Sequence, residues 1–170
     1  MQKITSAYAN KMLRSLEEDK AYWVNKEASS NTYVVSVNED PVIPEYDYLK
    51  VAKNIEEIDQ KIAIIKHALN LSNATAKVSV GNEEMSIDTI LIRMAQLNKR
   101  KLVLDQMRKQ LPKAREEQHY MARNAVPEYR YINYDLDLIK QEYERVSKTI
   151  MDMQMALDMY NQTVQFEVDL

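Results

Sequence analysis

The segment with the most chemical potential is residues 120–134, which read YMARNAVPEYRYINY. Arginine pairs bidentately with phosphate or carboxylate groups, whereas tyrosine stacks on flat rings and forms a hydrogen bond at its tip. Asparagine amides add groups that read base edges or hydroxyls. Such a cluster suits a small anionic aromatic ligand such as a nucleotide. The candidate ligand-binding residues in it are Arg123, Asn124, Tyr129, Arg130, Tyr131, Asn133 and Tyr134.

The same composition has a second interpretation, which involves no ligand. Tyrosine and arginine are also favoured at protein–protein interfaces, so the segment could be an amphipathic edge strand that packs across a subunit contact. The two interpretations are compatible if a ligand lies at that interface. The sequence leaves both open.

Other chemistry-bearing residues are sparse, and their spacing matches no catalytic pattern. His67 and His119 lie in no metal-ligand spacing, and the adjacent carboxylates at 83–84 and 116–117 point about 100° apart on a helix. No glycine-rich phosphate loop or nucleophile elbow is present. The absence of cysteine excludes disulfides, thiolate catalysis and zinc–thiolate sites. We therefore expect a protein that is not an enzyme, with no catalytic residues, no bound metal and no cofactor.

Charge and hydropathy narrow the class of partner. The net charge of -3 disfavours nucleic acid, because neutralising phosphates requires a basic face. Residues 1–16 lack the continuous apolar run of a signal peptide, and no apolar run is long enough for a transmembrane helix. We expect a cytoplasmic protein with neither a nucleic-acid nor a membrane partner.

The composition predicts a mainly α fold, because Gly occurs once and Pro four times in 170 residues. Helices are expected at about residues 5–26, 47–71, 87–110 and 135–160, with a further helical piece within 113–124. Short strands are expected at 33–37, 76–80, 126–134 and 164–168. Two helices carry apolar seams with coiled-coil steps of four and three. The seams are Val51, Ile55, Ile58, Ile62, Ile65 and Leu69, and Ile139, Tyr143, Val146, Ile150, Met153, Leu157 and Tyr160.

The two seams align at a constant offset of 88 residues, since Ile55 matches Tyr143 and 143 − 55 = 88. The match continues into Asn-x-Thr at Asn73 and Asn161, where each asparagine is expected in the left-handed conformation after its helix. This alignment predicts an internal duplication and a pseudo-twofold four-helix bundle of coiled-coil hairpins. We expect one domain over 1–170, with repeats of about 1–82 and 83–170.

The last predicted helix is apolar on two sides. Met151, Met155 and Met159 lie four residues apart, on a face offset from the Ile139–Tyr160 seam. One side serves the core of its own hairpin, and the other requires a second partner. This pattern predicts a homo-oligomer.

Three stretches of the chain read LNLSNAT, GNEEMSIDTILIRMAQL and MQMALDMYNQTVQFEVDL. They resemble the septicolysin-like family of bacterial and phage helical proteins, whose function is largely unassigned. The middle stretch often carries an Arg-Asp pair in that family. Arg93 matches the arginine and joins the candidate ligand-binding residues, but Met94 replaces the aspartate. The resemblance implies a helical fold and says little about activity.

Three functions remain open, and the least supported is an enzyme that turns over a nucleotide, suggested by the arginine–tyrosine segment with His119 nearby in the sequence. The first is a non-enzymatic, homo-oligomeric protein that sequesters a small nucleotide-like signalling molecule, as a phage or mobile-element counter-defence protein would. The alternative is a structural or interaction module that binds another protein through its helical faces. The arginine–tyrosine segment favours the first function, whereas a coiled-coil seam suits both.

Overall fold

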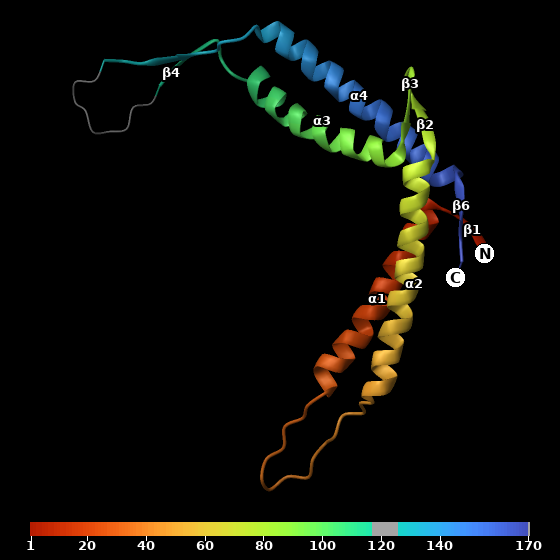
Figure 1. Ribbon diagram of the computed structural model, residues 1–170. Coiled ribbons are helices and arrows are strands. Elements are labelled where there is room, and N and C mark those ends of the chain that lie inside the picture. Colours follow the sequence, from red (N-terminus) through yellow and green to blue (C-terminus); the bar gives the residue numbers. More distant parts are fainter. Residues whose placement is uncertain (117–125, 170) are drawn as a thin grey trace. The chain divides into compact units, whose positions relative to one another are not determined.

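The computed structural model describes residues 1–116 and 126–169 (Figure 1). Within these ranges the chain is mainly helical, with four helices and six short strands. This confirms the predicted mainly α class with short β strands. The elements in order are β1 (Gln2–Thr5), α1 (Ser6–Ser30), α2 (Tyr48–Thr75), β2 (Lys77–Val80), β3 (Glu83–Ser86), α3 (Ile87–Arg108), β4 (Lys113–Arg115), β5 (Tyr129–Tyr131), α4 (Leu136–Thr163) and β6 (Gln165–Val168).

Three helices begin at side chains that cap their free N–H groups. Thr5 Oγ1 accepts a hydrogen bond from the backbone N–H of Tyr8 at 3.2 Å. Asp47 Oδ1 accepts from the N–H of Lys50 at 3.2 Å, and Asp135 Oδ1 accepts from that of Leu138 at 3.2 Å. A capping oxygen satisfies a donor that the helix itself leaves unpaired. Short polar residues just before the apolar seams therefore set where these helices start.

The chain forms two compact units, Met1–Lys77 with Asp158–Leu170, and Val78–Leu157. In the first unit α1 and α2 form an antiparallel hairpin, and β1 pairs with β6 at the end where α1 begins (Figure 1). The ion pair of Lys20 with Asp59, at 2.6 Å, also links the two helices. The buried core of this unit comprises Ile4, Ala9, Leu13, Ile58, Ile62, Ile65 and Val168.

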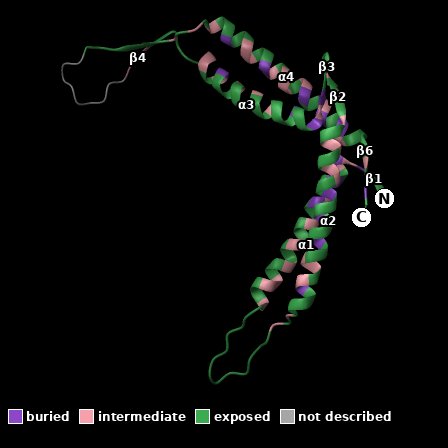
Figure 2. Ribbon diagram, in the orientation of Figure 1, coloured by how far each residue is buried: buried purple, intermediate pink, exposed green. Residues whose placement is uncertain are grey.

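The second unit is a hairpin of α3 and most of α4. Leu104 on α3 is fully buried against Ile139 and Val146 on α4. Tyr134 Oη donates a hydrogen bond to the main-chain oxygen of Met107 at 2.7 Å, which ties the end of α3 to the start of α4. Figure 2 shows short buried stretches along helices whose other residues are exposed or intermediate. The predicted seams therefore mark the inner faces of both hairpins.

The strands form three separate two-stranded sheets: β1–β6, β2–β3 and β4–β5. β1 and β6 are antiparallel, with Ile4 opposite Phe166. β2 and β3 are joined by Gly81 and Asn82, and Gly81 has a φ of +62°. Glycine suits this position because a side chain is strained in the left-handed region.

Three local predictions were wrong. Residues 33–37 form no strand, because no neighbouring strand completes a ladder there. Lys113–Arg115 is a strand rather than a helix. Asn73 and Asn161 are not in the left-handed conformation, because α2 and α4 continue through Thr75 and Thr163, whose hydroxyls donate to the carbonyls four residues back. Strands β1 and β3 were not predicted from the sequence.

Among the described residues, no helix has the length and apolarity needed to cross a bilayer.

Candidate functional site

The predicted ligand-binding residues of 129–134 lie on or just after strand β5. Two others, Arg123 and Asn124, lie outside the described residues. β5 pairs antiparallel with β4, with Lys113 opposite Tyr131 and Arg115 opposite Tyr129. We call this two-stranded sheet the ribbon. Figure 1 shows it at the end of the hairpin where α3 finishes and α4 begins.

The ribbon separates the predicted cluster onto two faces, because alternate residues of a strand point to opposite sides. One face, here called the cationic face, carries Lys113, Arg115, Tyr129 and Tyr131. The ammonium of Lys113 lies 4.3 Å from the ring centroid of Tyr129 and 5.5 Å from that of Tyr131. The tyrosines are 47% and 62% exposed, so the face is open to a partner.

Arg130 lies on the opposite face and already has an anionic partner. Its Nε and Nη2 donate to the two carboxylate oxygens of Glu116, at 2.9 and 2.5 Å. This is the bidentate geometry that arginine offers to carboxylate or phosphate. An anionic ligand would have to displace Glu116, so Arg130 is better placed to stabilise the ribbon than to bind a phosphate.

Asn133 and Tyr134 follow the ribbon and do not extend the cationic face. Asn133 is exposed. The hydroxyl of Tyr134 contacts both Met107 and Gln110 Oε1, and its ring packs against the Leu104 cluster. Tyr134 is thus part of the packing beneath the ribbon.

Arg93 lies far along α3 from the ribbon. Fifteen helical residues separate it from Arg108, a distance of about 22 Å at 1.5 Å per residue. Its Nη1 donates to Glu83 Oε2 at 2.8 Å. It lines a groove of about 350 Å³ together with Arg145, Thr149 and Asp152. The structure therefore does not bring Arg93 together with the tyrosines.

The arginines of this groove are paired with carboxylates. Arg145 contacts both carboxylate oxygens of Glu142, and this contact lowers the pKa of Glu142 and raises that of Arg145. Asp152 binds Lys148 at 2.7 Å. The groove is polar, but its charges are already neutralised.

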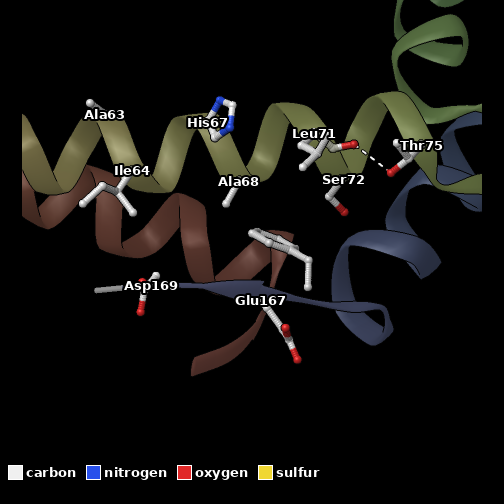
Figure 3. Close-up of a pocket in the computed structure, with 10 residues that line it drawn as sticks. Ala63, Ile64, His67, Ala68, Leu71, Ser72, Thr75, Glu167 and Asp169 are labelled. Carbon is white, nitrogen blue, oxygen red and sulfur yellow. Dashed lines mark hydrogen bonds between the residues drawn. The ribbon is translucent and has the colours of Figure 1, made fainter. Parts of the chain in front are cut away.

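A larger groove of about 720 Å³ lies between α2 and β6 in the first unit. Figure 3 shows Ile64, Ala68 and Ser72 on the side of α2 that faces β6, with His67 on the helix surface away from it. His67 is exposed. The lining is mostly apolar, and its Ser72 hydroxyl lies 2.6 Å from the hydroxyl of Tyr160, so the groove can accept an apolar group.

The most exposed apolar side chains lie on the loop of residues 31–47, here called the tip loop, which joins α1 to α2. Figure 2 shows it exposed along most of its length. The exposed fractions of Val34, Val37, Val42 and Ile43 are 100%, 102%, 91% and 64%. This surface was not predicted, because the composition of residues 33–37 favours a strand. No signal in the sequence distinguished this run from a strand, because composition does not reveal whether a neighbouring strand is present.

The methionines of α4 behave as two groups. Met153 is buried, whereas Met151, Met155 and Met159 are exposed. The helix therefore has the second apolar face that the spacing predicted. Among the described residues, no group of His, Cys, Asp or Glu side chains could hold a metal ion.

No family model and no curated protein matches the chain. One solved structure is similar: a functionally unknown conserved protein from Corynebacterium diphtheriae, with a TM-score of 0.64 and 14% identity. The alignment covers 98% of this chain and 100% of that one. At this identity the likeness shows a shared fold over nearly the full length of both chains.

Proposed function

We propose that this protein is a non-enzymatic interaction module whose tip loop binds a protein partner. The observation that carries the proposal is the exposure of four aliphatic side chains, Val34, Val37, Val42 and Ile43, on one short loop. Four exposed aliphatic side chains within ten residues of one loop support an interaction surface, because burying apolar area against a partner is favourable.

The scaffold beneath the loop supports this role. Loops held by a rigid scaffold commonly carry binding residues, since they vary without disturbing the core. Here α1 and α2 are joined by a buried apolar seam and by ion pairs, and Tyr46 at the loop's end donates to Glu27 Oε1 at 3.1 Å. The helices thus fix both ends of the loop.

We also propose that the protein is a homo-oligomer. The exposed stripe of Met151, Met155 and Met159 supports this proposal, because flexible thioether side chains suit an adaptable apolar interface. The tip loop and the methionine stripe would be separate surfaces.

A small nucleotide-like ligand is the second candidate function, with the phage counter-defence role that it suggests. It is supported by the cationic face, where a lysine sits beside two exposed tyrosines that could stack on a flat ring. The pairing of Arg130 with Glu116 weakens it. Calorimetry with a nucleotide panel tests it: heat lost on Tyr129→Ala would support sequestration, and no heat with any nucleotide would remove it.

The internal duplication belongs to the same proposal, because it accounts for two hairpins on one chain. The bounds of α2 and α4, and those of β2 and β6, differ by 88 residues at both ends. β1 and β3, with the starts of α1 and α3, share a second offset of 81 residues. Ser72 and Tyr160, equivalent by the offset of 88, share a hydrogen bond of 2.6 Å. The four-helix bundle remains a prediction.

The interaction function is tested by capture of proteins from the native host on immobilised wild type and on a tip variant. The tip variant carries Val34→Ser, Val37→Ser, Val42→Ser and Ile43→Ser. A matched control carries Leu49→Gln, Ile92→Gln, Leu102→Gln and Leu138→Gln, which are exposed aliphatic residues on helices. We expect a stoichiometric partner on wild type and control that is lost on the tip variant. Equal retention on all three would contradict the proposal.

A further inference from the structure

The tip loop is acidic as well as apolar. Residues 31–47 contain Glu39, Asp40, Glu45 and Asp47 and no lysine or arginine. Asp47 caps α2, which leaves three carboxylates on the loop proper. An anionic loop is repelled by nucleic acid and by acidic lipid surfaces. Its charge therefore favours a basic protein surface as partner.

The loop's backbone is also open to a partner. Among the described residues, its one internal backbone hydrogen bond runs from the Glu39 N–H to the Ser36 carbonyl, at 3.1 Å. Residues 33–37 are rich in β-branched side chains, which fit an extended conformation against another surface. Residues 33–37 therefore have the composition of a β-strand but no neighbouring strand with which to pair.

The cationic face of the ribbon has the complementary chemistry. Lys113 and Arg115 are exposed, and neither forms an ion pair with a residue in the described part of the chain. They flank two half-exposed tyrosines, which are rigid, amphipathic contact residues of the kind enriched at interfaces. Valine side chains could pack on the tyrosine rings while carboxylates pair with the two cations.

We propose that the tip loop of one copy docks on the cationic face of a second copy, which deepens the proposed interaction function and rests on it. Val34 and Val37 pack against Tyr129 and Tyr131, and Glu39 and Asp40 face Lys113 and Arg115. Such a contact is heterologous, because different surfaces meet, so repetition builds a ring or an open chain. The partner of the tip loop is thus this protein itself.

The absence of cysteine makes the test clean, because engineered thiols are the only ones present. Full-length Asn38→Cys protein is mixed with a size-tagged Glu128→Cys protein under mild oxidation. Both positions are exposed and flank the proposed contact. We expect the mixed disulfide dimer to exceed both same-variant dimers several-fold.

A charge swap establishes specificity. Lys113→Glu with Arg115→Glu should remove the mixed dimer, and added Glu39→Lys with Asp40→Lys on the other copy should restore it. In sedimentation velocity the reversed face should weaken self-association by about tenfold, given the size of exposed ion pairs. Lys11→Glu with Arg14→Glu, which makes the same charge change on exposed α1 residues, should leave association unchanged.

The outcomes distinguish docking between copies from the more general proposal that the tip loop binds a protein. Dimers in statistical proportion, unaffected by the charge swap, would overturn docking between copies. If the tip variant still loses another captured protein, the interaction function stands with a different partner. If it loses nothing, both proposals fall.

Discussion

The tip loop and the ribbon occupy corresponding places, each joining the two helices of a hairpin, yet they differ in structure and charge. The tip loop has no regular secondary structure, four carboxylates and exposed aliphatic side chains. The ribbon is a paired β structure with lysine, arginine and tyrosine on one face. Similar apolar seams support both. The apolar seams therefore specify the hairpins, whereas the connections carry the exposed aliphatic, acidic and cationic side chains.

The grooves within the two hairpins also differ in the chemistry of the side chains that line them. In the first unit Met12, Leu16 and Ile65 line an apolar groove of about 350 Å³. In the second unit a groove of about the same volume contains Arg93, which stands 81 residues after Met12. The same offset relates the starts of α1 and α3. At the offset of 81 residues, the apolar Met12 of the first groove therefore corresponds to the charged Arg93 of the second.

The largest expected loss of stability follows from substitutions in the apolar seam of either hairpin. Ile65 and Leu104 are fully buried, one in each hairpin, so Ile65→Ala and Leu104→Ala should each lower the free energy of unfolding by about 2–5 kcal/mol. Urea unfolding followed by circular dichroism measures this. Leu102→Ala, an exposed neighbour on α3, is the control. A loss below the effect of Leu102→Ala would contradict the assigned cores.

A smaller effect is expected at the turn between β2 and β3. Gly81 has a positive φ with open space around it, so Gly81→Ala should cost about 1–2 kcal/mol through backbone strain alone. Gly81→Asn should cost less, because asparagine tolerates this conformation better. Thermal unfolding of both variants measures the difference. Equal stability of Gly81→Ala and wild type would show that the turn is not constrained as described.

A pH effect is expected beneath the ribbon. Lys109, and then Arg108, hold the pKa of Asp105 below its usual value through hydrogen bonds. Because the folded pKa is the lower one, this stabilisation is present above the unfolded pKa, near 4, and is lost as pH falls through the folded pKa. Arg108 also stacks 4.0 Å from the ring centroid of Tyr143. In unfolding measured from pH 6 to pH 2, Asp105→Asn should show a shallower loss of stability than wild type, and an identical slope would contradict this.

The smallest effect on stability is expected at the tip loop. The fully exposed Val34 and Val37 contribute nothing to the core, so Val34→Ser with Val37→Ser should change the free energy of unfolding by less than about 0.5 kcal/mol. Chemical unfolding beside Ile65→Ala measures the contrast. A loss above 1 kcal/mol would mean that the loop packs on the scaffold and is not a free recognition surface.

The sequence predicted the helices and their inner faces well, because apolar periodicity reports directly on burial. Val51, Ile58, Val146 and Met153 were placed in seams and are buried. Asp47 and Asp135, which the structure shows as caps, stood at the predicted helix starts. The positions of the helices could therefore be predicted from the sequence.

The site was less predictable, because it depends on partners distant in sequence. Nothing in the sequence around Arg130 indicated that its guanidinium would pair with Glu116. Nor did the sequence indicate that the ammonium of Lys113 would lie close to the rings of Tyr129 and Tyr131. Residues 33–37 have strand composition, but a strand requires a neighbour that composition does not reveal. β1 was missed for the complementary reason, since its partner β6 lies at the other end of the chain.

The most direct test is a calorimetric titration against the partner of the tip loop, which is either a second copy or a captured protein. It compares wild type, the tip variant and the matched control with four substitutions on the helices. The four aliphatic side chains should together contribute enough buried area to weaken binding by about 100-fold or more when replaced by serine. The account predicts that loss in the tip variant and unchanged affinity in the control. Unchanged affinity in the tip variant, with loss in the control, would place recognition on the helices and contradict the central claim.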